Sequence, residues 1–89
     1  MKSAHPKLQI KNGSVAFVMI NCKAGYETEV IEQLRNIEEV TEVIPTYGSY
    51  DILAKIESST INHVRDIIIW KIKKIERIYS TTTLMRINP

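Results

Sequence analysis

The sequence contains little of what marks several specialised protein classes. Its single cysteine, Cys22, rules out an internal disulfide, and its cysteine and histidines lack zinc-ligand spacing. Three glycines and three prolines are too few for a collagen-like chain. No apolar run approaches the roughly 20 residues that cross a bilayer, and residues 1–14 lack the apolar stretch of a signal peptide. We therefore expect a cytoplasmic protein that uses no metal or other cofactor and does not contact a membrane.

A charge excess of either sign is also missing. The chain has 12 Lys and Arg against 10 Asp and Glu, a net charge of +2, whereas binding along a phosphate backbone usually needs a clear basic excess. There is no glycine-rich phosphate loop, and the expected central strands lack an aromatic platform for stacking bases. The basic residues within 71–77 lie at the end of a predicted helix, where the helix dipole favours cations. Direct binding of DNA or RNA is not expected.

What the sequence does contain is an apolar pattern that predicts strands and helices in the order β-α-β-β-α-β. Residues 15–22 are apolar almost throughout, which is typical of a strand in the middle of a covered sheet. Pro45 cannot donate to a strand ladder, so its strand is expected at a sheet edge. The predicted strands are 15–22, 40–47, 50–57 and 79–87, and the predicted helices are 25–37 and 61–75, the second capped by residues 58–60.

This order predicts one α+β domain with a ferredoxin-like βαββαβ sandwich. In that fold a four-stranded antiparallel sheet carries two helices on one face. Residues 15–87 are expected to form the domain. Residues 1–14 are expected to be an N-terminal tail, in which the pair Asn12-Gly13 favours a hairpin turn and an additional short strand over 8–11.

The predicted fold leaves one face of an apolar sheet bare. A chain of 89 residues also buries only about 60 to 68% of its unfolded surface, so association would stabilise it. We therefore expect homodimers that pack sheet against sheet. The apolar arc of the second helix is wider than one core needs, so Trp70 is expected either in the core or at a further subunit contact.

Two polar clusters are candidates for chemistry. Gly48 allows a close backbone approach to a ligand, and Tyr50 and Asp51 beside it supply a donor and an acceptor. The commoner interpretation of that spacing is a hairpin turn whose Asp caps its own backbone. Residues 81–83 are three threonines on a strand, where cross-strand threonine pairs are common.

The sequence gives little support for a catalytic site. A nucleophilic Cys22 would need a base, and no motif places His5 or His63 beside it, so we expect a small buried apolar residue. Glu38 and Glu39 are adjacent and point in different directions, and the glutamates of the first helix fit a solvated face. Paired-carboxylate catalysis is therefore not favoured.

Several stretches of the chain carry a resemblance to a known family. The most specific is the loop Gly48-Ser49-Tyr50-Asp51, followed by a hydrophobic strand and, further on, by the run Thr81-Thr82-Thr83. The others are residues 16–20, 25–30 and 42–43. Together they resemble the effector-binding domain of the Lrp/AsnC transcription regulators, also called the RAM domain, over about residues 15–87.

The resemblance implies a non-enzymatic module for amino-acid sensing and oligomerisation. In the family, dimers pack through their sheets and join into rings such as octamers or decamers, and a small amino-acid effector binds between dimers. By this resemblance the ligand-binding residues are Gly48, Ser49, Tyr50, Asp51, Thr81 and Thr83.

The resemblance also bears on domain organisation. Full-length family members carry an N-terminal helix-turn-helix domain, whereas 14 residues precede the first predicted strand here. The chain therefore resembles the stand-alone form, whose expected partner is a full-length paralogue. The chain departs from the family pattern at Ala24-Gly25 and Glu76-Arg77, where Pro-Gly is frequent, and at Tyr47, where Thr is frequent.

Two enzyme classes share the predicted topology. A dimeric α+β-barrel enzyme of the cofactor-free oxygenase or isomerase kind is the alternative function, and it would need a His, Asn or Arg placed between helices and sheet. The residues predicted to face that interior are almost wholly aliphatic. An acylphosphatase would need an Arg on a phosphate-binding loop after the first strand, and residues 21–25 contain none.

Overall fold

The computed structural model of the chain describes residues 13–86. Its elements are β1 (Ser14–Cys22), α1 (Glu27–Arg35), β2 (Val40–Pro45), β3 (Ile52–Ser58), α2 (Ile61–Ile67), the π-helix η1 (Ile68–Ile72) and β4 (Ile78–Met85). This order confirms the ferredoxin-like βαββαβ prediction. The strand expected over 8–11 and its turn residue Asn12 lie outside the described residues.

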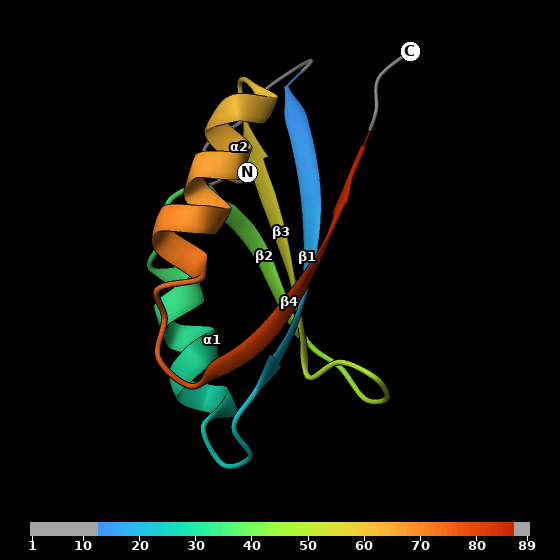
Figure 1. Ribbon diagram of the computed structural model, residues 1–89, viewed down its shortest axis with the longest axis vertical. Coiled ribbons are helices and arrows are strands. Elements are labelled where there is room, and N and C mark those ends of the chain that lie inside the picture. The colour runs from blue at the N-terminus through green and yellow to red at the C-terminus, as the bar shows by residue number, and fades with distance from the viewer. Residues whose placement is uncertain (1–12, 87–89) are drawn as a thin grey trace, which may run out of the picture.

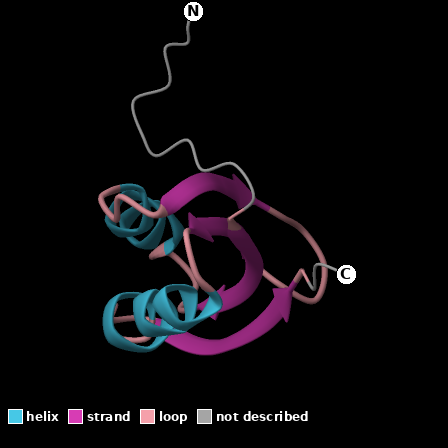
Figure 2. Ribbon diagram, turned by 90° about the horizontal axis from the view of Figure 1, so that it is seen from above, coloured by secondary structure: helices cyan, strands magenta, loops and turns pink. Residues whose placement is uncertain are grey.

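The four strands form one antiparallel sheet in the order β2-β3-β1-β4. β1 lies between β3 and β4, and β2 lies at an edge, so the positions predicted from the apolar first strand and from Pro45 are confirmed. The helices lie on one face of the sheet (Figure 1). Seen from above, the sheet curves around the helix layer (Figure 2). One face of the sheet is therefore covered by helices and the other is open.

The core lies between the helices and the covered face. Because side chains alternate along a strand, every second residue of β3, and of β1 from Ala16 onward, is buried. The strand residues that are 0% exposed are Ala16, Val18, Ile20, Ile52, Ala54 and Ile56. The helices contribute the buried residues Val30, Leu34, Val64, Ile67, Ile68 and Ile72. This interior is aliphatic, as predicted.

The second helix begins as predicted but does not stay an α-helix. The His63 N–H donates to Thr60 Oγ1 at 3.1 Å, which caps α2. From Ile68 the chain forms η1, in which the Lys73 N–H donates to the Ile68 carbonyl at 2.9 Å, five residues back. The apolar spacing predicted a helix without indicating this wider turn. Trp70, on η1, is 64% exposed, so the alternative that placed it in the core is wrong.

The turn before β4 contains the one non-glycine residue with positive φ among residues 13–86. Arg77 has φ of 78°, in the region that glycine adopts most easily, at a position where the family pattern favours glycine. Its carbonyl accepts a hydrogen bond from the Lys23 N–H at 2.8 Å. Its guanidinium lies 4.5 Å from the centre of the Tyr26 ring. These contacts tie the start of β4 to the turn after β1.

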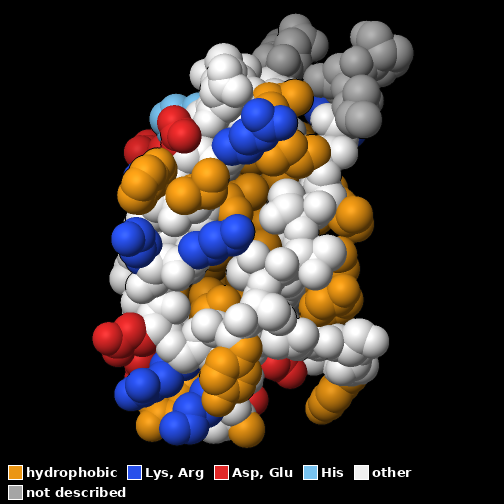
Figure 3. All heavy atoms as spheres, viewed as in Figure 1, with side chains coloured by type: hydrophobic (Ala, Val, Ile, Leu, Met, Phe, Trp, Pro, Cys, Tyr) orange, Lys and Arg blue, Asp and Glu red, His pale blue; other side chains and the backbone are white. Residues whose placement is uncertain are grey.

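The open face of the sheet is apolar only in part, because Lys55 lies opposite Phe17 and Glu57 lies opposite Val15. Phe17 pairs with Leu84 in the β1–β4 register, and Met19 pairs with Leu53 in the β1–β3 register. Leu84 is 57% exposed and Ile44 on β2 is 41% exposed. Figure 3 shows hydrophobic side chains along this side of the molecule. Residues 13–86 therefore leave apolar side chains on this face of the sheet without cover.

Candidate ligand-binding site

The loop between β2 and β3 carries the most specific motif of the sequence. Thr46 closes it, because its N–H donates to the Asp51 carbonyl at 2.9 Å and its Oγ1 donates to the Tyr50 carbonyl at 2.7 Å. Gly48 sits at the tip with φ of 109°, a conformation that side chains disfavour. This turn explains why β2 ends at Pro45 and β3 begins at Ile52, inside the predicted bounds.

Asp51 joins the loop to the central strand. Its Oδ2 accepts a hydrogen bond from the Cys22 N–H at 2.9 Å, and its own N–H donates to the Ile20 carbonyl at 2.9 Å. The β1–β4 register shifts between Asn21 and Cys22, so the carboxylate satisfies a main-chain donor at an irregular point of the ladder. The expectation that Asp51 caps its own backbone is therefore wrong, because the backbone that it caps belongs to β1.

A cavity of about 430 Å³ lies beside this carboxylate. It is lined by Glu27, Pro45, Thr46, Tyr47 and Asp51. Glu27 comes from the first turn of α1, and its Oε1 accepts a hydrogen bond from the Gly25 N–H at 3.0 Å. The cavity thus has two carboxylates in its lining and no Lys or Arg. Sequence reasoning did not identify Glu27 as a lining residue, because the glutamates of this helix were expected on a solvated face.

A second cavity opens on the other side of the loop. Its volume is about 240 Å³, and Ser49 and Tyr50 line it together with the open-face residues Met19 and Leu53. Its lining is mainly apolar. The loop therefore presents an acidic cavity on one side and an apolar one on the other.

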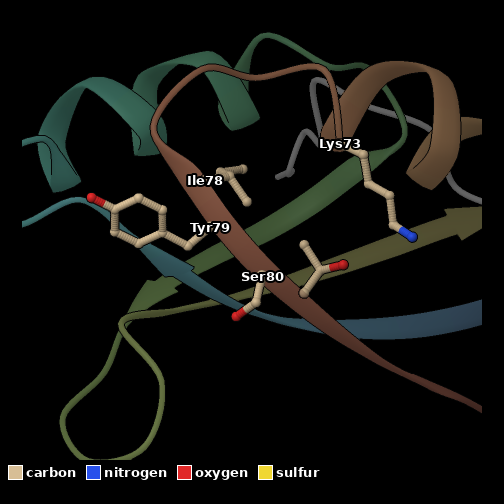
Figure 4. A pocket seen from close by; sticks show the side chains of 5 residues that line it. Lys73, Ile78, Tyr79 and Ser80 are labelled. Atoms are coloured by element: carbon tan, nitrogen blue, oxygen red, sulfur yellow. The ribbon is translucent and has the colours of Figure 1, made fainter.

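The threonines lie elsewhere in the chain. Thr81 and Thr83 are opposite Ile20 and Val18 in the β1–β4 register, so they share the helix side of the sheet with those residues. Thr81 lines a cavity of about 380 Å³ with Lys73, Ile78, Tyr79 and Ser80, between the end of η1 and β4 (Figure 4).

Within one chain the loop and the threonines do not line a common cavity. Ile20 pairs with both Ile52 and Thr81, so β1 stands between the start of β3 and Thr81. Two strand spacings separate these residues, about 10 Å. The predicted site residues therefore form two groups on different parts of the surface, the loop 48–51 and the β4 threonines.

The cysteine is not arranged as a nucleophile. Cys22 is a buried free thiol. Burial, with smaller contributions from the negative charges of Asp51 and Glu27, raises the pKa of the Cys22 thiol above its ordinary value and disfavours the thiolate. His63 contacts Glu39 instead, and His5 lies outside the described residues. Within residues 13–86 the structure therefore does not place a histidine beside Cys22 as a base.

Glu39 is the other residue that sequence reasoning missed. It is 8% exposed at the start of β2, where its Oε2 lies 3.2 Å from His63 Nε2 and its Oε1 lies 3.6 Å from Lys71 Nζ. Burial alone would raise the pKa of Glu39, but a backbone hydrogen bond, the His63 hydrogen bond and the charges of Lys71 and His63 together lower it. Glu39 therefore joins α2 and η1 to the sheet as a carboxylate.

Within residues 13–86, no group of three or more His, Cys, Asp or Glu side chains is placed to hold a metal ion. In the same part of the chain, no helix is long and apolar enough to cross a membrane.

Comparisons with known proteins agree with one another. The family model of the Lrp/AsnC ligand binding domain matches residues 15–88. The regulatory protein AsnC of Haemophilus influenzae is 36% identical over 75 residues, which cover 82% of this chain and 50% of that protein. The chain spans about half the length of the curated relatives it matches. Those relatives are named as a regulatory protein or as HTH-type transcriptional regulators.

Solved structures give the same match. The hypothetical protein PHS023 from Pyrococcus horikoshii is 36% identical with a TM-score of 0.80, and the match covers 85% of this chain and 92% of that one. Escherichia coli AsnC is 25% identical with a TM-score of 0.81, and the match covers 97% of this chain and 62% of that one.

Proposed function

Because the chain belongs to the Lrp/AsnC ligand-binding domain family, we propose that it binds a small amino acid between dimers and that this ligand controls its assembly. The observation that carries the proposal is the position of Asp51 in the family-like loop. One of its oxygens is held by the Cys22 N–H, and the carboxylate lines the acidic cavity. A fixed carboxylate in a cavity without basic residues suits the ammonium group of an amino acid.

The open face of the sheet supports the dimer in this proposal. Packing two such faces across about 10 Å removes Phe17, Leu84 and their neighbours from water by a two-fold operation. The separation of the site into two groups supports binding between dimers. A loop from one dimer and β4 from another can meet around one ligand, whereas in one chain β1 keeps them apart.

The proposed ligand-binding set is the one expected from the resemblance, extended by one residue. It consists of Gly48, Ser49, Tyr50, Asp51, Thr81 and Thr83, together with Glu27. The ligand shifts assembly only to the extent that it binds one oligomeric state more tightly than another. Octamers or decamers are the expected rings.

The relatives are regulators, and we propose a regulatory role in the cytoplasm rather than catalysis. The enzyme alternative is not favoured, because the described helix–sheet interior is aliphatic and contains no His, Asn or Arg. The protein then acts on transcription without direct DNA contact, by co-assembly with a full-length Lrp/AsnC paralogue. Native mass spectrometry of the two chains mixed should show mixed oligomers, and only homo-oligomers would contradict co-assembly.

Binding calorimetry with the common L-amino acids tests the proposed site. Asp51→Asn is the sharp variant, because its amide oxygen still accepts from the Cys22 N–H while the negative charge is lost. We expect wild type to bind a subset of amino acids and Asp51→Asn to bind them at least about tenfold more weakly, since charge-assisted hydrogen bonds contribute 1.5 kcal/mol or more. Full affinity in a folded Asp51→Asn variant would contradict the proposal.

A further inference from the structure

The cavity at β4 differs in chemistry from the acidic cavity at the loop. Its lining contains one cation, Lys73, and the hydroxyl-bearing residues Tyr79, Ser80 and Thr81, but no Asp or Glu. Lys73 takes part in none of the ion pairs formed among residues 13–86. The cavity volume of about 380 Å³ is within the ordinary range for small-ligand sites. The cavity is therefore suited to a small anionic group.

The π-helix determines which lysine faces this cavity. Lys71, Lys73 and Lys74 follow one another closely, and an α-helix would rotate Lys73 about 140° away from the buried Ile68, at about 100° per residue. In the structure the Lys73 N–H instead donates to the Ile68 carbonyl at 2.9 Å, and this wider turn rotates Lys73 less far from Ile68 than an α-helix would. Figure 4 shows the Lys73 side chain extending from the helix end toward the strands.

The other two lysines are engaged elsewhere. Lys71 Nζ lies 3.6 Å from Glu39 Oε1, and Lys74 Nζ lies 5.5 Å from the centre of the Trp70 ring. The wide turn therefore separates three neighbouring lysines into an ion pair, a ring contact and a cavity-lining group. A π-turn within an α-helix is rare and is often found at functional sites.

Thr81 adds two donors beside Lys73. In an antiparallel pair the residues that exchange backbone hydrogen bonds alternate with residues that do not. The Arg86 N–H donates to the Val15 carbonyl, so that alternation leaves the backbone N–H of Thr81 directed away from β1, toward the free edge of the sheet. Its hydroxyl is on the helix side, together with Ile20. Ser80 Oγ, by contrast, accepts a hydrogen bond from Asn21 Nδ2 on the open side, at 3.5 Å.

We propose that Lys73 belongs to the ligand-binding set and, together with the N–H and hydroxyl of Thr81, binds the carboxylate of the amino-acid ligand. This inference rests on the proposed function, in which Asp51 of a neighbouring copy binds the ammonium. In one chain Asp51 and Thr81 lie on the two sides of β1 and line no common cavity.

A carboxylate fits this cavity better than a phosphate. The lining supplies a single positive charge, without an arginine fork or a glycine-rich loop, and so matches a monoanion. Lys73 was considered from the sequence only as part of a helix end that favours cations. The register of η1 and the position of β4 at the sheet edge give Lys73 a second role, in binding the carboxylate.

Nuclear magnetic resonance titrations of the full chain with sodium propionate, ethylamine and inorganic phosphate test the carboxylate half by itself. Propionate is a carboxylate without an ammonium, so its binding depends neither on Asp51 nor on a shared ligand. We expect propionate to shift the amide signals of Lys73 and Thr81, and ethylamine to leave them unchanged. Lys73→Met should weaken propionate binding at least about tenfold, because a charge-assisted hydrogen bond is lost.

Two matched variants separate the role of Lys73 from general effects of charge and folding. Lys74→Met removes the same charge from the next position, whose ammonium lies over Trp70, and should leave propionate binding unchanged. Thr81→Val keeps the branched shape and removes the hydroxyl, and it should weaken binding several-fold. Equal propionate affinity in wild type and Lys73→Met, or tighter binding of phosphate than of propionate, would overturn the inference.

Amino-acid titrations distinguish this inference from the proposed function. Binding that is lost in Asp51→Asn but kept at full affinity in Lys73→Met overturns the role of Lys73 and leaves the proposed function standing. Propionate binding that depends on Lys73, in a protein that binds no amino acid, supports the carboxylate cavity and overturns the proposed function. Loss of amino-acid binding in both variants, with folding intact, supports both.

Discussion

The two faces of the sheet are built from the same strands, yet they differ in composition and in surroundings. On β3, Ile56 points to the helices and is 0% exposed, whereas Leu53 points to the open face and is half-buried. On β1, Val18 and Phe17 differ in the same way. The helices complete the covered face within residues 13–86, and the open face is the one that the proposed dimer covers. On β3 the charged residues Lys55 and Glu57 mark the open face, whereas residues 15–20 of β1 are apolar on both faces and do not reveal which face is which.

The largest effect should come from the covered face. Ile56→Ala opens a cavity in a core that cannot collapse around it, and should lower the free energy of unfolding by about 2–5 kcal/mol. Urea denaturation at a fixed protein concentration measures this. Leu53→Ala, a similar truncation on the opposite face of the same strand, should act mainly on association. An Ile56→Ala loss below about 1 kcal/mol would mean that the helix layer does not form the core described here.

The next effect concerns the open face. Phe17→Ala should weaken dimerisation by about 2 kcal/mol, roughly 30-fold in the dissociation constant, because a central aromatic side chain dominates such an interface. Circular dichroism should show that the variant stays folded, and sedimentation equilibrium should show its monomer at concentrations where wild type is dimeric. An unchanged dissociation constant would indicate that dimers do not form through the sheets.

A smaller effect should come from the Glu39 contacts, which exist only on the covered side. The folded state lowers the pKa of Glu39, so the carboxylate contributes stability at neutral pH that is lost as the pH falls through the folded value. Glu39→Gln should lower the free energy of unfolding by about 1–3 kcal/mol at neutral pH, through the weakened contacts with His63 and Lys71.

The pH dependence is the specific check on this prediction. The stability difference between wild type and Glu39→Gln should shrink as the pH is lowered below the ordinary range of a glutamate, since wild-type Glu39 then loses its charge too. The adjacent residue Glu38 is exposed and provides the control, since Glu38→Gln should change stability little at any pH. A Glu39→Gln difference that stays constant down to strongly acidic pH would rule out the carboxylate as its cause.

The smallest effect should appear at the turn that leads into β4. Arg77→Gly and Arg77→Ala both remove the guanidinium from the Tyr26 ring, but only glycine adopts a φ of 78° without strain. The glycine variant should therefore be the more stable of the two by about 1 kcal/mol. Thermal unfolding of the pair measures the difference, and an alanine variant as stable as the glycine variant would show that the turn relaxes.

The sequence predicted the features that depend on local chemistry. Proline at the β2 edge, the Thr60 cap and the apolar β1 all follow from one residue or one short run. The η1 turn could not be predicted in this way, because an extra residue in a helix hardly alters its apolar spacing. The burial of Glu39 could not be predicted either, since it depends on His63 and Lys71, which are distant in sequence and close only after folding.

The candidate site likewise contains residues that the sequence predicted and residues that it did not. The loop 48–51 was recognisable because its motif is contiguous and requires Gly48 at positive φ. Glu27 and Lys73 were not recognised as site residues, because each looks like an ordinary helix-end charge until the fold places it in a cavity. The two cavities carry opposite charges and lie on different parts of the surface, so nothing in the sequence relates one to the other.

The most direct test of ligand-controlled assembly is the native mass of the full chain by light scattering, with and without each common L-amino acid. We predict sheet-paired dimers that convert to a defined ring, or a ring that tightens, with one subset of amino acids, and no such change in Asp51→Asn or Lys73→Met. A dimer whose mass is the same with every amino acid would contradict the central claim.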